Sequence, residues 1–179
     1  VLRLDITICP TDFAAMQEEL EELYGSETGG GGPGGGPPGG GRPGEALAVP
    51  SYQSALVAFD GKTWPTVGIR YKGNSSLSQG YQAGSQKLPF RLKFDHYEED
   101  YEEVDDQRFW GFKDLKFSSA FEDDSVMKDL MLAESFRESG VPAARGGFMR
   151  IYVDVGNGPE FWGVYTAFED PAGELLDDW

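Results

Sequence analysis

A run of glycine and proline sets the first limit on how this chain can fold. Residues 29–44 contain eleven Gly, four Pro and one Arg. This composition offers no apolar side chains to bury and predicts a disordered insertion. About 160 residues remain, enough for one domain with a sizeable core, so we expect the segments on both sides of the insertion to fold together.

The remaining segments predict an α+β fold. Apolar residues alternate with polar ones over residues 2–8, the period of a half-buried strand, and a helix is expected from about residue 12 to residue 24. The strongest helix signal covers residues 126–139. We therefore expect an antiparallel sheet with one long packed helix and a shorter N-terminal helix. Further strands are expected at residues 56–61, 66–73 and 87–95, and in a final hairpin over 148–155 and 161–168 with a turn at Asn157-Gly158.

Charge and composition exclude several classes of function. The formal charge is −16, which argues against nucleic-acid binding. No apolar run is long enough to span a membrane, and we expect no intact signal peptide within this sequence. The single Cys9 rules out an intramolecular disulfide and a cysteine-rich zinc site.

Positive charge gathers in one part of this acidic chain. Residues 61–94 contain six Lys and Arg and no Asp or Glu. Strand parity places Arg70 and Lys72 on one face of one expected strand, and Lys87, Arg91 and Lys93 on one face of the next. The uncharged residues 73–86 between them are rich in Gly and Ser and can bring backbone N–H groups close to an anion. The pattern is typical of a phosphate or nucleotide cradle, and a solvated sheet face with a flexible loop gives the same pattern.

The segment that follows is strongly acidic. Residues 95–106 hold eight Asp and Glu in twelve positions, without the spacing of an EF-hand. We expect a solvated loop there, with His96 as an exposed residue rather than a catalytic base. No metal site is predicted.

Five sequence motifs follow one another in a specific order. They are IRYKGNSS at 69–76, QKLPFRLKFD at 86–95, QRFWGFKDLKF at 107–117, DDSVMKDLMLAESFRESGVPAAR at 123–145 and GVYTAFEDP at 163–171. Together they resemble the CotH (spore-coat protein H) kinase family, across residues 1–179. That family consists of atypical protein kinases with a two-lobed, kinase-like fold. The resemblance implies that this chain is the small, N-terminal lobe, which binds ATP.

The resemblance also implies roles for individual residues. Lys87 is the expected catalytic lysine on the ATP phosphates, with Lys93 as the runner-up. Asp129 stands where the family usually carries a glutamate that pairs with this lysine, and Glu169 lies in the segment that leads to the hinge between lobes. The other expected ATP-binding residues fall in the motif that replaces a glycine-rich loop: Arg70, Lys72, Gly73, Asn74, Ser75 and Ser76.

Phosphoryl transfer also needs carboxylates that hold Mg²⁺ or Mn²⁺. The resemblance places them in a large C-terminal lobe that this chain lacks, so we expect a fragment that is inactive alone. The implied function is a secreted or spore-surface kinase that uses ATP to phosphorylate Ser or Thr of coat or extracellular proteins. The alternative is a non-catalytic surface, adhesion or protein-interaction module on a kinase-like scaffold.

Overall fold

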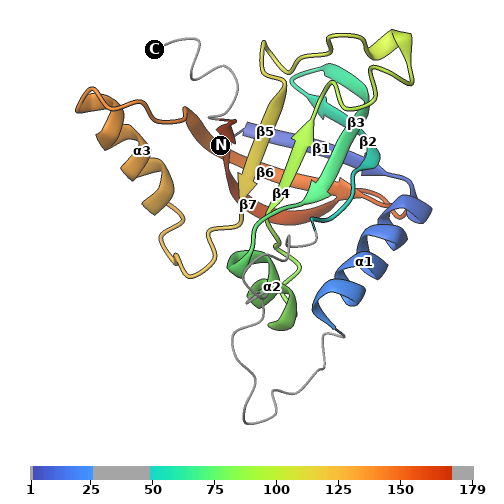
Figure 1. Cartoon of the computed structure of the whole chain (residues 1–179), viewed down its shortest axis with the longest axis horizontal. Helices are drawn as coiled ribbons and strands as arrows, with labels where there is room; N and C mark the ends of the chain where they lie inside the picture. The colour runs from blue at the N-terminus through green and yellow to red at the C-terminus, as the bar shows by residue number, and fades with distance from the viewer. Residues whose placement is uncertain (1, 26–48, 171–179) are drawn as a thin grey trace, which may run out of the picture.

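A computed structural model describes residues 2–25 and 49–170, which form a closed barrel of seven strands with three short helices (Figure 1). The expected insertion at 29–44 lies outside the described residues. The elements in chain order are β1 (Leu2–Ile8), α1 (Pro10–Tyr24), β2 (Gln53–Phe59), β3 (Lys62–Tyr71), α2 (Ser75–Gln82), β4 (Phe90–Lys93), the 3₁₀ turn η1 (Glu102–Val104), β5 (Asp114–Ser118), α3 (Lys128–Glu138), β6 (Gly146–Asp154) and β7 (Glu160–Glu169).

The barrel closes through a pairing between the first strand and a late one. The strand order is β1-β2-β3-β4-β5-β7-β6, and β1 then pairs in parallel with β6, from Leu2 opposite Met149 to Thr7 opposite Asp154. All other neighbouring strands are antiparallel. The prediction of an α+β kinase-like small lobe with an antiparallel sheet is therefore wrong. Periodicity identifies strands but carries no information on which distant strands pair, so it could not show the closure.

Alternating side chains fill the barrel. In β1, Leu4, Ile6 and Ile8 are buried, as the sequence pattern predicts, while Leu2 at the end of the strand is 58% exposed. The same parity in β3 and β4 turns apolar residues inward and leaves the basic residues on the outer surface. The interior is rich in aromatic rings, with Phe90 stacked on Phe117 at a centroid distance of 4.4 Å. The outer surface of β3 and β4 is therefore free to carry the charge that the sequence concentrates there.

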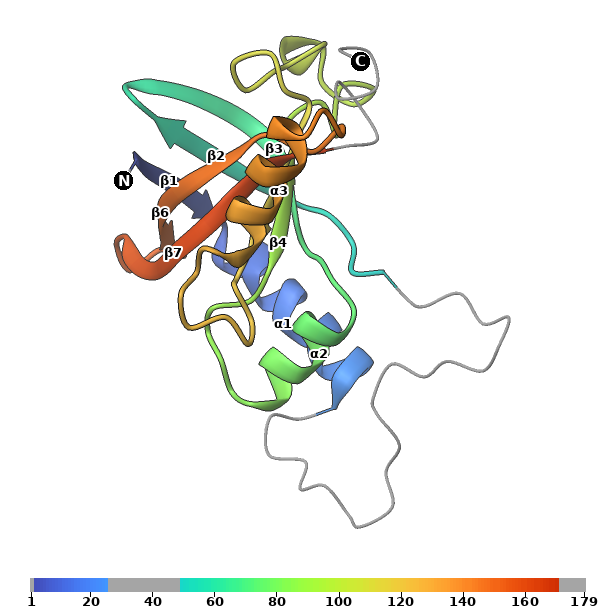
Figure 2. The ribbon, with the colours of Figure 1, turned by 90° about the vertical axis from the view of Figure 1, so that its left-hand side faces the viewer.

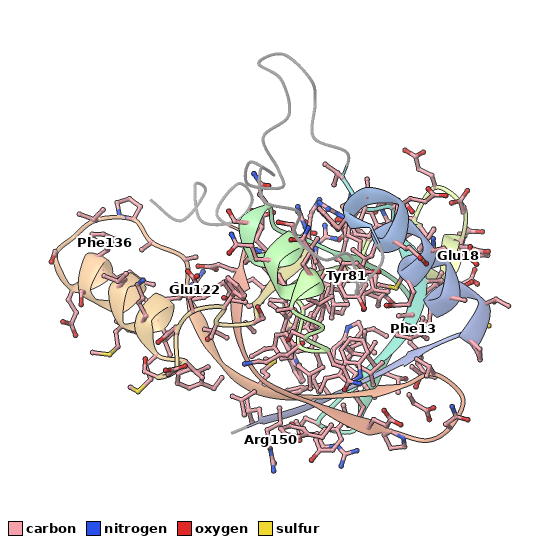
Figure 3. All side chains as sticks on the ribbon, turned by 90° about the horizontal axis from the view of Figure 1, so that it is seen from below. Phe13, Glu18, Tyr81, Glu122, Phe136 and Arg150 are labelled. Carbon is pink, nitrogen blue, oxygen red and sulfur yellow. The ribbon has the colours of Figure 1, made fainter. Side chains whose placement is uncertain are left out.

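The helix that was expected to be long and packed is neither. α3 has 11 residues, none of them buried, and it stands beside the barrel rather than over it (Figures 1 and 2). Leu130 and Ala133 are half-buried, whereas Leu132 and Phe136 are about half exposed, and Figure 3 shows Phe136 apart from the side chains that fill the barrel. The amphipathic pattern is present, but the barrel packs its apolar side chains inside itself and buries no residue of α3.

The other two helices lie together at one end of the barrel (Figure 2). α1 buries Met16 and Leu20 against the core. α2 lies inside the small-residue segment that the sequence presented as a loop, because Leu77 and Tyr81, four residues apart, are both buried. No helix among residues 2–25 and 49–170 is long and apolar enough to span a membrane.

The acidic segment after β4 is anchored by its first residue. Asp95 is 4% exposed and lies 3.2 Å from Arg108 and 3.6 Å from Lys113. His96 stacks on Tyr52 at a centroid distance of 4.0 Å and packs over Gly68, where an added Cβ would lie 2.6 Å from the Cβ of His96. The segment therefore has a defined structure of turns and one 3₁₀ turn.

Lowering the pH from about 7.5 to about 5.5 is expected to destabilise the barrel partly through His96. Burial lowers the pKa of His96, and the charge of Lys93 adds to this effect. The unfolded chain therefore binds this proton more readily, and stability is lost as the pH falls through the unfolded pKa of about 6.5. The His96→Phe variant keeps a ring against Tyr52 without titrating, so its melting temperature should fall less over the same pH range. An equal fall of the melting temperature in both proteins would contradict the assignment of this pH dependence to His96.

Candidate functional site

Four cations gather on the outer face of β3, β4 and β5. Arg70, Arg91 and Lys116 are direct cross-strand neighbours in this order, and Lys72 follows Arg70 by two residues on the same face. We call these four residues the cation cluster.

Two carboxylates neutralise only part of the cluster. Asp170 accepts hydrogen bonds from Arg91 at 2.5 Å and from Lys116 at 2.7 Å, and Asp114 accepts one from Arg91 Nε at 2.8 Å. Among the described residues, the structure records no ion pair for Arg70 or Lys72. The guanidinium of Arg70 instead lies 5.0 Å from the centroid of the Tyr52 ring. The four cations of the cluster therefore form ion pairs with only two acids, Asp114 and Asp170, among the described residues.

The electrostatics of Lys72 show the consequence of this excess. Burial lowers the pKa of its ammonium, and the charges of Lys116 and Arg91 lower it further, while Asp170 opposes them. The charged form of Lys72 is thus less favourable in the folded protein than in water, and a bound anion would offset the charges of its neighbours. The cluster is suited to bind a group with several negative charges, such as a polyphosphate.

Replacing Lys72 with methionine is expected to stabilise the protein, because the variant keeps the aliphatic stem and removes a half-buried charge surrounded by like charges. The melting temperature should rise by roughly 2–4 °C for each kcal/mol gained. Lys62→Met is the control, because the ammonium of Lys62 lies outside the cluster, over the ring of Trp64. A lower melting temperature for Lys72→Met than for the wild type would show that this charge is compensated.

The start of α2 lies next to the cluster along the chain. Gly73 follows Lys72 and has φ +111°, and an added Cβ would lie 2.8 Å from Ser76 Oγ, so glycine is required there. Asn74 precedes the helix, and its side chain makes no capping hydrogen bond. The first N–H groups of α2, from Ser75 onward, are thus available as anion donors beside Lys72.

Asp129 lies at the edge of the same face. Ser118 follows Lys116 by two residues on β5 and donates a hydrogen bond of 2.9 Å from its hydroxyl to Asp129 Oδ2. The start of α3 is held by Asp123, which accepts a hydrogen bond of 2.9 Å from the backbone N–H of Lys128. An acid from α3 and a lysine from β5 are therefore both placed at this surface.

The other residues singled out by the sequence lie elsewhere. The stem of Lys87 packs against Gly163 and its ammonium lies 5.4 Å from the centroid of Tyr165, where burial lowers its pKa. Lys93 lies 3.9 Å from Asp95, next to the acidic segment. Glu169 is buried and pairs with Arg145 at 3.2 Å. The structure thus brings together Arg70, Lys72 and the start of α2, with Asp129 nearby. Lys93 lies on the same face of β4, two residues after Arg91, but pairs with Asp95. Lys87 and Glu169 make their contacts with other residues.

Lys116 and Asp170 were missed by sequence reasoning. Lys116 lies beyond the acid-free segment, and only the pairing of β4 with β5 places it beside Arg91. The alternation in residues 113–117, with Leu115 and Phe117 buried, could have shown that Lys116 points outward. No local signal connects Asp170 to Arg91, which lies 79 residues away in the sequence.

Comparison with known families agrees with the resemblance. The family model described as CotH kinase protein matches residues 69–178, from the end of β3 to beyond β7. The match covers more than half of the chain, and the chain belongs to the CotH kinase family. No curated protein matches it.

Proposed function

We propose that this chain is the ATP-binding part of a CotH-family protein kinase, with the phosphates of ATP on the cation cluster. The observation that carries the proposal is the gathering of four cations in the cluster, which form ion pairs with only two acids of the described residues, in a chain of net charge −16. Family membership supports a kinase-related role. The start of α2 would add backbone donors to the same phosphates.

The metal would arrive with the nucleotide. Mg²⁺ or Mn²⁺ bridges phosphate oxygens and neutralises charge during phosphoryl transfer. The described residues contain no group of three or more His, Cys, Asp or Glu that could hold a metal ion. In this proposal the described part of the protein binds and orients the phosphates through the cation cluster, with Asp129 hydrogen-bonded to Ser118 at its edge. We further propose that the acceptors are Ser or Thr of coat or extracellular proteins, and that the protein acts outside the cytoplasm.

Calorimetric titration with ATP and Mg²⁺ or Mn²⁺ tests the proposal. The wild type should bind, and a double variant, Arg70→Ala with Lys72→Ala, should bind at least about tenfold more weakly, because two charge-assisted contacts are lost. Lys62→Ala is the control at a lysine outside the cluster. Lys87, the phosphate contact predicted from the sequence, is measured in the same series as Lys87→Ala. Absence of binding, or equal binding by the double variant, would contradict the proposal.

One observation favours the alternative of a non-catalytic interaction module. α3 and its flanks expose several large apolar side chains: Met127, Met131, Leu132, Phe136 and Val141. Exposed apolar side chains gathered on one element are typical of surfaces that bind other proteins. If ATP does not bind, this surface is the next candidate for function.

A further inference from the structure

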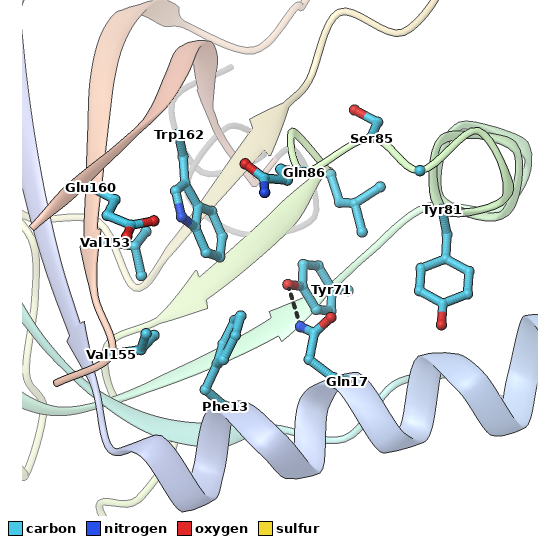
Figure 4. A pocket seen from close by; sticks show the side chains of 12 residues that line it. Phe13, Gln17, Tyr71, Tyr81, Ser85, Gln86, Val153, Val155, Glu160 and Trp162 are labelled. Atoms are coloured by element: carbon cyan, nitrogen blue, oxygen red, sulfur yellow. Dashed lines mark hydrogen bonds between the residues drawn. The ribbon is translucent and has the colours of Figure 1, made fainter. Parts of the chain in front are cut away.

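A cavity at one end of the barrel lies between α1, α2 and the strands β6 and β7 (Figure 4). Its volume is about 270 Å³, at the lower limit of pockets that hold drug-sized ligands, which start at roughly 300 Å³. It therefore suits a small headgroup rather than a whole nucleotide. Because the residues of the cation cluster do not line it, it is separate from the site described above.

Aromatic rings form much of the cavity wall. Phe13 from α1 and Trp162 from β7 face each other at a centroid distance of 6.0 Å, and Tyr71 and Tyr81 come from β3 and α2. Gln17, one helical turn after Phe13, donates a hydrogen bond of 3.0 Å to the hydroxyl of Tyr71. Rings from four different elements thus surround one small space.

The charge of the cavity comes from one residue. Among the described residues that line it, Glu160 alone is charged, and no ion pair is recorded for its carboxylate. Burial raises the pKa of Tyr71 to about 12, so its phenol stays neutral at physiological pH. Aromatic faces, each with a negative quadrupole, together with one carboxylate favour a cationic ligand.

We propose that this cavity binds a small organic cation of the quaternary-ammonium type. A compact ammonium such as that of lysine would lose strong hydration that the aromatic rings cannot replace. A methylated ammonium spreads its charge over methyl groups that pack on aromatic faces, which is how aromatic cages bind such ligands. Free choline-like molecules and trimethyl-lysine side chains share this headgroup.

Lys87 is the neighbouring cation that could oppose such a ligand. Its side chain does not line the cavity: the stem packs against Gly163, and the ammonium lies over the ring of Tyr165. The face of Tyr165 therefore attracts this ammonium at a position outside the cavity lining. If the charge of Lys87 determined which ligands the cavity binds, anions would bind there and cations would not.

Choline and 3,3-dimethylbutan-1-ol give a direct test, because they have the same shape and differ in the charge of the central atom. Binding is followed by the NMR signal of the Trp162 indole N–H in the full chain. Choline should bind at least about tenfold more tightly than the neutral alcohol. Equal affinities, no binding of choline at about 10 mM, or binding of inorganic phosphate at this signal would overturn the proposal.

Two variants distinguish charge from shape. Glu160→Gln should weaken the affinity for choline by about 3- to 10-fold and leave the affinity for the neutral alcohol unchanged, because the carboxylate attracts only the cation. Glu18→Gln, an exposed acid on α1 outside the cavity, is the matched control and should change neither. Loss of choline binding in the control but not in Glu160→Gln would overturn the proposal.

A competition experiment with peptides distinguishes the two possible sources of the headgroup. A short peptide with trimethyl-lysine should compete with choline, and the same peptide with unmodified lysine should compete at least about tenfold less well. Competition by the trimethyl-lysine peptide more strongly than by free trimethyl-lysine identifies a protein source, and equal competition identifies a free small molecule. Equal competition by the unmodified peptide would contradict selectivity for a methylated ammonium.

Discussion

Replacing Lys116 with methionine is expected to weaken the binding of ATP by roughly 10- to 100-fold, since a charge-assisted hydrogen bond contributes about 1.5–3 kcal/mol. Lys116 belongs to the cation cluster, opposite Arg91 and two residues before Ser118, which donates a hydrogen bond to Asp129. The methionine variant keeps most of the apolar stem, and Asp170 retains its contact with Arg91. The change should therefore affect anion binding more than the fold, and calorimetric titration with ATP and Mg²⁺ measures it.

Lys113→Met is the matched control for this experiment. Lys113 lies just before the same strand but 3.6 Å from Asp95, beside the acidic segment rather than the cluster. Its replacement should leave the affinity for ATP within about twofold of the wild type. A similar loss of affinity in both variants would mean that ATP binding depends on the overall charge of the protein and not on a specific site.

The second large effect is expected for the stability of the protein, from a substitution in the strand that closes the barrel. Ile6 on β1 is 1% exposed and lies opposite Val57 of β2 and Val153 of β6, so it packs where the parallel pairing closes the barrel. Ile6→Ala should lower the free energy of unfolding by about 2–5 kcal/mol, because it leaves a cavity in this interior. Chemical denaturation followed by circular dichroism measures the loss.

Leu2→Ala is the control on the same strand. Leu2 has the same parity but is 58% exposed, so its truncation should change the stability by no more than about 0.5 kcal/mol. If Ile6→Ala were as mild as Leu2→Ala, β1 would not be an integral strand of the barrel.

The sequence allowed the strands to be predicted better than their assembly. The alternation over residues 2–8 and the final hairpin of β6 and β7 are confirmed, because both depend on neighbouring residues. The parallel pairing of β1 with β6 joins segments about 150 residues apart, and no local pattern specifies it. The packing of α3 was predicted wrongly for the same reason, since an amphipathic helix does not reveal whether a sheet face remains for it.

In the candidate site too, the sequence predicted local features better than contacts between distant segments. Parity correctly placed Arg70 and Lys72 on the outer face, and the register of β4 then aligned Arg91 with them. Lys116 joins the cluster, and Asp170 pairs with it, only through β5 and β7, which are distant in sequence. The family resemblance is confirmed, but the roles that it implied for Lys87, Asp129 and Glu169 stay predictions.

Mapping the backbone amides that shift when ATP and Mg²⁺ are added tests the central claim most directly, since it locates the nucleotide without any substitution. The largest shifts in the NMR spectrum should cover residues 70–76, Arg91 and Lys116, where the cation cluster meets the start of α2. Largest shifts at Phe13, Gln86 and Trp162, which line the barrel-end cavity, would contradict the placement of the phosphates on the cation cluster.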